Sequence, residues 1–175
     1  MDTIQVHILQ APDDRSIEEL SDVLVDCVEG GASVSFMLPI ARATAIAFWR
    51  EVAASVGRGE RILLTAQDAA KSIVGTVQII LAQAENQPHR ADIAKMLVHR
   101  RARRLGVGAA LLAAAEKAAR DAGKTLLVLD TASGDAERLY AKLGWRRCGV
   151  IPGYALLPGG GLCDTTFYYR TLASR

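Results

Sequence analysis

The sequence predicts an α/β protein built on one mixed sheet with helices on both faces. Apolar residues recur with period 2 in some segments and with period 3.6 in others, and the two kinds of segment alternate along the chain. Short groups of Gly, Pro and polar residues separate them, with no linker and no repeat. The chain has 175 residues, which suffices for one substantial core, so we expect a single domain over residues 1–175.

The first predicted elements are a short strand and two helices. Apolar residues alternate within Thr3–Leu9, which predicts the strand. After turn and N-cap residues, apolar positions recur at helical spacing over Ile17–Val28, and two glycines end this helix. A second helix is predicted over Arg42–Val56, where an apolar stripe returns and glycines again follow.

Three strands are predicted next. The segment Arg61–Ala66 is short and apolar, and a turn separates it from Ser72–Ala84, in which apolar residues alternate. This pattern indicates an antiparallel hairpin. The polar, Pro-containing segment Glu85–His89 is a loop, and Asp92–His99 is the next strand.

In the C-terminal half the apolar period changes from 2 to 3.6. It predicts a helix that begins near Val107 and ends near Gly123. The segment Thr125–Asp130 is apolar almost throughout, as expected for a strand covered on both faces. A short helix over Asp135–Leu143 follows, and residues 145–172 form two last strands around a Gly/Pro turn. The predicted order is β α α β β β α β α β β.

Composition excludes several classes of protein. Half of the residues are hydrophobic and 23% are charged, which excludes a disordered chain, and a net charge of +2 gives no case for nucleic-acid binding. No signal-like start and no uninterrupted apolar stretch of about 20 residues is present, so we expect no membrane partner. Three widely spaced cysteines (Cys27, Cys148, Cys163) argue against a disulfide framework or a metal site and fit a reducing cytoplasm.

A basic, glycine-containing segment lies between a predicted strand and a predicted helix. The first N–H groups of a helix lack intrahelical partners, and the helix dipole favours negative charge there. Glycines let an anion approach the backbone, and arginines add charge-assisted hydrogen bonds. Together these features indicate an anion site rather than a solvated arginine-rich surface. The residues predicted to form it are Arg103, Arg104, Leu105, Gly106, Val107, Gly108 and Ala109.

The spacing Arg103-x-x-Gly106-x-Gly108 resembles the (Q/R)-x-x-G-x-(G/A) signature of the GNAT family of N-acetyltransferases. A second block of that family, an apolar strand followed by A-x-x-(F/L)-Y-x-x-x-G-F, is matched by Leu126–Asp130 and residues 136–145. The resemblance implies acetyl-CoA as cosubstrate, with its pyrophosphate on the loop amides. It also implies a mixed, mostly antiparallel sheet of about six to seven strands, with helices on both faces and splayed central strands.

A narrower resemblance runs over almost the whole chain. Residues 30–37, Arg90-Ala91-Asp92 and Pro152-Gly153-Tyr154 are similar to the tabtoxin-resistance type of acetyltransferase, with Asp92 where a Glu is expected. The implied acceptor is a β-lactam amino-acid toxin or a small amine of similar shape, which implies a role in antibiotic resistance.

The family resemblance implies that Tyr140 lies beside the sulfur of acetyl-CoA and protonates the departing thiolate. A phenol, with a pKa of about 10, suits this task. The alternative is a tyrosine that only packs on a helix face. Because the family works by direct attack of the amine, neither Cys148 nor Cys163 is needed as a nucleophile.

Two carboxylates are candidates for the base, or for a group that binds the acceptor amine. Asp92 is expected to share one strand face with Met96, and Asp130 ends the following strand. The resemblance implies that these two strands splay apart and that the amine enters near the opening. Asp130 could instead cap the next helix, and Asp92 could be a solvated edge residue.

The resemblance implies further contacts. A backbone N–H of Leu97 or Val98 is expected to bind the acyl oxygen, and Ser133 stands where the family often has an Asn that contacts CoA. The segment between the first two helices is expected to form a wall of the acceptor pocket, with simple packing as the alternative. The residues assigned to this wall are Ser33, Phe36, Met37 and Tyr154.

Three functions compete at this level. The first is a small-molecule N-acetyltransferase, and the second is a protein acetyltransferase acting on N-terminal or lysine amines. The third is a nucleic-acid-binding module without enzymatic activity, supported only by the arginines at 100, 101, 103 and 104; an aromatic content of 5% disfavours it. The apolar C-terminal segment would allow a homodimer through strand contact.

Overall fold

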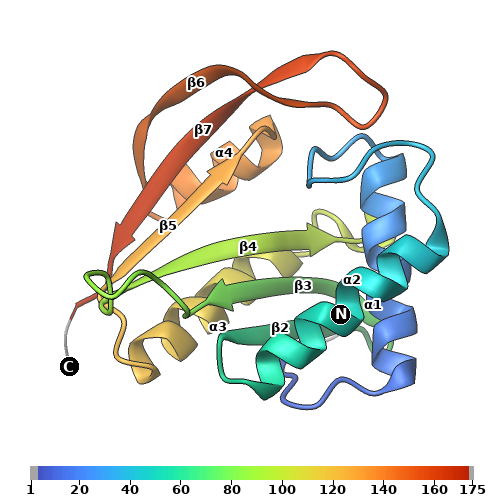
Figure 1. The fold of residues 1–175 in the computed structure, drawn as a ribbon, viewed down its shortest axis with the longest axis horizontal. Coiled ribbons are helices and arrows are strands. Elements are labelled where there is room, and N and C mark those ends of the chain that lie inside the picture. Colours follow the sequence, from blue (N-terminus) through green and yellow to red (C-terminus); the bar gives the residue numbers. More distant parts are fainter. Residues whose placement is uncertain (1–3, 174–175) are drawn as a thin grey trace.

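The computed structural model describes residues 4–173 and has one seven-stranded sheet with helices on both faces (Figure 1). The expected fold class is confirmed, as is the order of helices and strands. Thr3, the expected first residue of the first strand, lies outside the described residues. The elements are β1 (Gln5–Ile8), α1 (Asp14–Glu29), α2 (Arg42–Gly57), β2 (Arg61–Gln67), β3 (Ile73–Ile80), β4 (Arg90–Val98), a 3₁₀ turn (Arg100–Ala102), α3 (Val107–Asp121), β5 (Leu126–Thr131), α4 (Gly134–Lys142), β6 (Arg146–Leu156) and β7 (Leu162–Thr171).

The strands lie in the order β1-β2-β3-β4-β5-β7-β6. All neighbours are antiparallel except β4 and β5, which are parallel. The connection between these two strands is α3, as a parallel pair requires a crossover. The parallel pair stands in the middle of the sheet, and its two strands diverge along their length (Figure 1).

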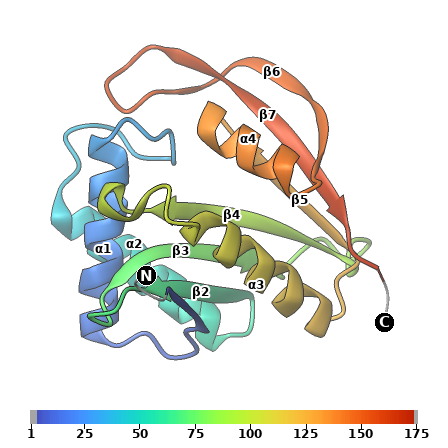
Figure 2. The same ribbon diagram turned by 180° about the vertical axis from the view of Figure 1, so that it is seen from behind.

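Two hydrophobic cores lie on opposite faces of the sheet. The first packs α1 and α2 against β2–β4 and includes Leu24, Trp49 and Leu63. The second, on the face seen in Figure 2, packs α3 and α4 against the sheet and includes Leu111 and Tyr140. The face of α1 and α2, where the sequence predicts the acceptor pocket, is called the acceptor face below, and the face of α3 is called the α3 face.

Two of the differences from the predicted strand boundaries have a clear structural cause. β4 begins at Arg90 rather than Asp92, because Arg90 and Ala91 pair with the start of β5. β3 ends at Ile80 rather than Ala84, because the amides of Leu81 and Ala82 donate to the Glu60 carbonyl, before β2, instead of continuing a ladder.

The hairpin formed by β6 and β7 reaches across to the segment between α1 and α2 (Figure 1). Three hydrogen bonds between described residues join them: Ser33 Oγ donates to the Leu156 carbonyl at 3.0 Å, the Leu38 amide donates to the Pro158 carbonyl at 2.9 Å, and Cys163 Sγ donates to Ser33 Oγ at 3.6 Å. Segments more than 100 residues apart in sequence therefore meet beside the opening between β4 and β5. Among the described helices, none has the length and apolar character needed to cross a membrane.

Candidate active site

The opening between β4 and β5 is the central feature of the site. The two strands pair at only three positions, the last of which joins Asp92 to Val128. Beyond that position β4 continues to Val98 and β5 to Thr131 without pairing to each other. One edge of β4 is therefore free of its neighbour, and its backbone groups are available to another molecule.

A β-bulge reshapes β4 beside this opening. The register with β3 shifts between Thr76 and Gln78, and Lys95 has a φ of 48°. The extra residue reverses the alternation of side chains, so that Met96 packs into the α3-face core and Leu97 into the acceptor-face core. The expectation that Asp92 and Met96 share a face was wrong, because a bulge lies between them.

The N-terminus of α3 is open to an anion. Gly106, its N-cap, has a φ of 81°, and no side chain of residues 4–173 caps the first amides of this helix. A Cβ built on Gly106 would have nothing within 4 Å, so the space next to the turn is free. Arg104 also has a positive φ, of 63°, which tightens the turn into the helix. An uncapped N-terminus with free space beside it fits a pyrophosphate.

The other residues of the basic loop have distinct surroundings. Arg103 Nε donates to the Val98 carbonyl at 3.3 Å, so this arginine ties the loop to the end of β4. A Cβ on Gly108 would lie 3.0 Å from Leu139 Cδ2, so this glycine allows α3 to approach α4. Leu105 is 63% exposed at the tip of the turn. The remaining residues predicted for the anion site are Val107, which is buried, and Ala109, which is half-buried, both in the first turn of α3.

The direction of the β4 amides distinguishes Val98 from Leu97. The His99 amide donates to Val74 in β3 at 2.9 Å. Because successive backbone groups of a strand point to opposite edges, the Val98 amide points away from β3, toward the side that β5 has left. Its carbonyl, which accepts from Arg103, agrees with this direction. The Leu97 backbone faces β3.

Tyr140 lies in α4 at the α3-face side of the opening and is 4% exposed. Its ring contacts Trp145 and Tyr168, with centroids 5.8 and 5.7 Å apart. Burial raises the pKa of its phenol well above the ordinary value, and the negative charge of Asp130 raises it further. The phenol therefore keeps its proton at neutral pH, and it is close enough to sense Asp130.

The two candidate carboxylates have different partners. Asp130 is exposed on β5 just past the last β4–β5 pair, and its Oδ2 accepts from Thr165 Oγ1 at 2.9 Å. Asp92 lies at the last pair itself, where Gln83 Nε2 donates to it at 3.2 Å and Arg90 forms an ion pair at 3.5 Å. The charge of Asp92 is thus partly compensated by its own strand. Asp130 faces the opening.

Ser133, rather than Asp130, caps α4. Its side chain accepts from the Ala136 amide at 3.4 Å, which removes helix capping as the explanation for Asp130. Ser133 is exposed at the end of the β5–α4 connection. The CoA contact expected of it stays a prediction.

Sequence reasoning missed the cation of this site, Lys95. The bulge turns its side chain to the acceptor face, where Nζ donates to Ser35 Oγ at 2.9 Å and lies 5.9 Å from the centroid of the Phe48 ring. Burial lowers the pKa of its ammonium group, and the charge of Asp130 opposes this shift. A charged residue within the apolar run Ile93–Val98 was the available signal.

The residues predicted to line the acceptor pocket take several roles. Ser33 joins the α1–α2 segment to the hairpin, and Phe36 packs edge-to-face on Phe48 with centroids 5.3 Å apart. Tyr154 is 52% exposed and lies edge-to-face on Phe167, the neighbour of Asp130 in β7. Met37 is exposed. The structure thus brings Phe36 and Tyr154 to the elements that surround Lys95 and Asp130.

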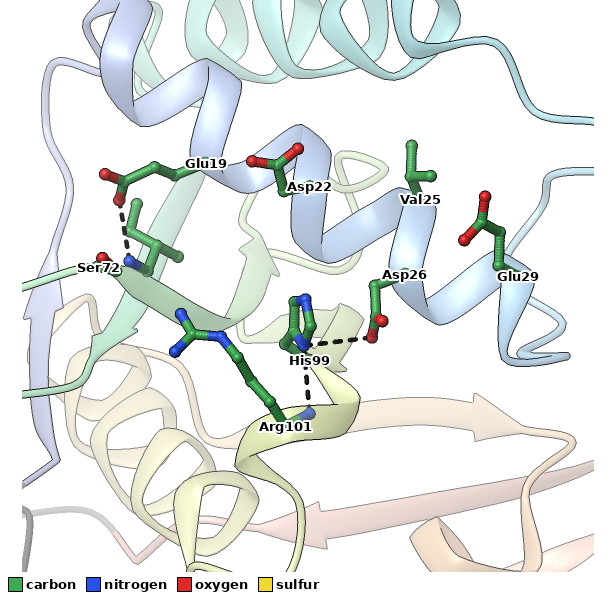
Figure 3. Close-up of a pocket in the computed structure, with 9 residues that line it drawn as sticks. Glu19, Asp22, Val25, Asp26, Glu29, Ser72, His99 and Arg101 are labelled. Carbon is green, nitrogen blue, oxygen red and sulfur yellow. Dashed lines mark hydrogen bonds and ion pairs between the residues drawn. The ribbon is translucent and has the colours of Figure 1, made fainter.

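A separate pocket of about 420 Å³ lies between α1, the start of β3 and the 3₁₀ turn that follows β4 (Figure 3). Four carboxylates line it, against one arginine and one histidine, so its charge does not suit an anionic cofactor; these residues are Glu19, Asp22, Asp26, Glu29, Arg101 and His99. Two loop arginines are paired with acids around it: Arg100 with Asp26 at 2.9 Å and Arg101 with Asp68 at 2.8 Å. These ion pairs reduce the positive charge that a nucleic-acid partner would need.

Comparison with known proteins agrees with this geometry. The model of the acetyltransferase (GNAT) family matches residues 35–145 of this chain. A phosphinothricin acetyltransferase of the GNAT superfamily from Sinorhizobium meliloti, solved in complex with acetyl-CoA, superposes with a TM-score of 0.79 at 16% identity, covering 98% of this chain and 89% of that one.

Two further solved structures share the fold. An N-acetyltransferase from Staphylococcus aureus Mu50 has a TM-score of 0.79 at 16% identity, over 98% of this chain and 99% of that one. A ribosomal-protein-alanine N-acetyltransferase from Brucella melitensis has a TM-score of 0.75 at 20% identity, over 97% and 99% of the two chains. At these identities the likeness concerns the fold.

Proposed function

Because this chain belongs to the acetyltransferase (GNAT) family of acetyl-CoA-dependent enzymes, we propose that it acetylates the primary amine of a small molecule. The observation that carries the proposal is the early end of pairing between β4 and β5 beside the uncapped N-terminus of α3. An anion site and a free strand edge then adjoin each other, as a long cofactor with a pyrophosphate and an amide-containing arm requires.

The cofactor contacts follow from these two features. The first amides of α3 and the turn at Gly106 hold the pyrophosphate, and Arg104 supplies charge beside them. The free edge of β4 pairs with the amide-containing arm, and the Val98 amide is the donor for the acyl oxygen. Bound acetyl-CoA supplies a thioester whose acetyl group passes to the amine nitrogen as the C–S bond breaks, with release of CoA as the thiol.

The chain's own side chains handle the protons. Asp130 attracts the acceptor ammonium and takes its proton, directly or through water, so that the nitrogen can form the C–N bond. Asp92, partly compensated by Arg90, adds negative charge on the same face. Tyr140, protonated at neutral pH, donates to the departing sulfur.

The hairpin contacts favour a small acceptor over a polypeptide. The α1–α2 segment and the β6–β7 hairpin border the acceptor face, and they are joined by the Ser33–Leu156 and Leu38–Pro158 hydrogen bonds. An extended peptide would need an open groove between these two elements. The resemblance to the tabtoxin-resistance type and the fold shared with a phosphinothricin acetyltransferase support an amino-acid-like toxin or antibiotic as the acceptor. A homodimer and a cytoplasmic location stay predictions of the sequence.

The test is CoA release from acetyl-CoA, followed with a thiol reagent, against a panel of amines. The panel holds lactam amino acids, other amino acids, polyamines, aminoglycosides and lysine-containing peptides. Turnover of a small amine, with peptides inactive, supports the proposal. If acetyl-CoA stabilises the protein but only peptides turn over, the protein acetyltransferase function replaces it.

A further inference from the structure

Lys95 is a cation with no acidic partner in the part of the chain that the structure describes. Among residues 4–173 it takes part in no ion pair, and its ammonium group donates to the neutral hydroxyl of Ser35 at 2.9 Å. It is half-buried beside the Phe48 ring, and burial lowers its pKa. A cation held in this way is costly to desolvate, which indicates that a missing partner of opposite charge belongs there.

A second cation strengthens the positive charge at this position. Arg61 of β2 is close enough for its charge to disfavour the protonated form of Lys95. Its guanidinium is held by neutral groups, Ser55 Oγ at 2.8 Å and Gln78 Oε1 at 2.6 Å. Gln78 is 1% exposed, and its Nε2, a hydrogen-bond donor, has no partner within the described residues. Lys95, Arg61 and Gln78 thus form a donor-rich end of the acceptor face.

The opposite charge stands across the opening. The charge of Asp130 raises the pKa of Lys95, yet the two form no ion pair in the described part of the chain. Asp130 accepts a hydrogen bond from the Thr165 hydroxyl, and Lys95 donates one to the Ser35 hydroxyl. The site therefore presents a negative and a positive group that face one space without neutralising each other. A molecule that carries both an ammonium and an anionic group matches this arrangement.

We propose that Lys95 is a specificity-determining residue that binds the carboxylate of a zwitterionic amino-acid acceptor, while Asp130 receives its amine. The inference rests on the proposed function and names the acceptor's second charge. The β4 bulge is what places Lys95 in this role, because it turns a residue of the signature strand toward the acceptor face. Amines without a carboxylate leave the ammonium group of Lys95 without its counter-charge and are poorer substrates.

The test compares L-amino acids with the corresponding amino-acid amides as acceptors at saturating acetyl-CoA. The amides keep the amine and the side chain and lose only the negative charge. Wild-type kcat/KM should be about 10- to 100-fold higher for the acids, the range expected for one charge-assisted hydrogen bond. Lys95→Met should remove this preference through a raised KM for the acids, with the amides changed less than about threefold, and Lys95→Arg should restore part of it.

Lys71→Met is the matched control, because Lys71 is also a lysine at positive φ next to β3 but lies exposed in a turn. It should leave the preference unchanged. Stabilisation by acetyl-CoA, measured by thermal unfolding, reports whether Lys95→Met is folded. Equal rates for acids and amides in the wild type, or an equal loss for both in Lys95→Met, overturn the role of Lys95 alone. If acetyl-CoA binds and neither class of small amine turns over, the proposed function is overturned with it.

Discussion

Lys95 and Asp130 face the same opening between β4 and β5, and within the described residues neither belongs to an ion pair. They reach this position by different routes. Asp130 lies two residues after Val128, the last residue of β5 that pairs with β4, whereas a β-bulge turns the Lys95 side chain toward the opening. Each charge is hydrogen-bonded to a neutral hydroxyl group instead: Lys95 donates to Ser35, and Asp130 accepts from Thr165.

Asp130→Asn should lower kcat/KM for the amine acceptor by about 100-fold, because the neutral amide cannot accept the proton of the ammonium group. Asp92→Asn should cost less, since Arg90 already compensates that carboxylate. Stabilisation by acetyl-CoA should be unchanged in both variants. Steady-state kinetics across pH check this, and equal losses for the two variants would contradict the distinction drawn between them.

Tyr140→Phe should reduce kcat on the order of 100-fold and leave acetyl-CoA affinity nearly intact. The substitution keeps the ring that packs on Trp145 and Tyr168 and removes only the hydroxyl. Single-turnover measurements with saturating acceptor separate this chemical step from product release. An unchanged rate would remove Tyr140 from the mechanism.

The raised pKa of Tyr140 also makes stability depend on pH. In the unfolded chain this phenol ionises near pH 10, whereas in the folded protein it retains its proton to higher pH. Its contribution is therefore complete below about pH 10 and is lost as pH rises above that value, by up to roughly 1.4 kcal/mol per pH unit. In urea unfolding, the difference between the free energies of wild type and Tyr140→Phe should stay constant up to about pH 9, and above pH 10 it should shift against the wild type. Curves that stay parallel to pH 11 would show that the phenol is not shielded.

Gly106→Ala and Gly123→Ala form a matched pair that separates backbone strain from cofactor binding. The two glycines flank α3 with φ values of 81° and 76°, and a Cβ on either meets nothing within 4 Å. Each substitution should lower the free energy of unfolding by roughly 1–2 kcal/mol, the cost of a left-handed alanine. Acetyl-CoA at about 100 times its dissociation constant for the wild type should stabilise Gly123→Ala by about 2.7 kcal/mol and Gly106→Ala much less. Equal stabilisation of both would contradict the assignment of the anion site to the N-terminus of α3.

The start of α3 and the order of elements were predictable because the sequence patterns that indicate them are local. The strand Thr125–Asp130, for example, is apolar almost throughout. A 3.6-residue period of apolar residues defines the helices, and the glycines at 57, 106 and 123 mark their ends. Most boundaries fall within two residues of the prediction. The prediction of an anion site, which stays a prediction, needed only the known chemistry of a helix N-terminus and of glycines in the preceding turn.

The sequence by itself therefore determined the fold class, the order of its elements and the glycine-containing turn that begins α3, where the cofactor's phosphates are predicted to bind. Only the tertiary structure decided where β4 and β5 stop pairing, that Lys95 sits in a bulge, and that Ser133 rather than Asp130 caps α4. It also decided that the β6–β7 hairpin meets the segment around Ser33 and Ser35. Register, bulges and contacts between distant segments depend on the packing of several elements at once, and no local period records them.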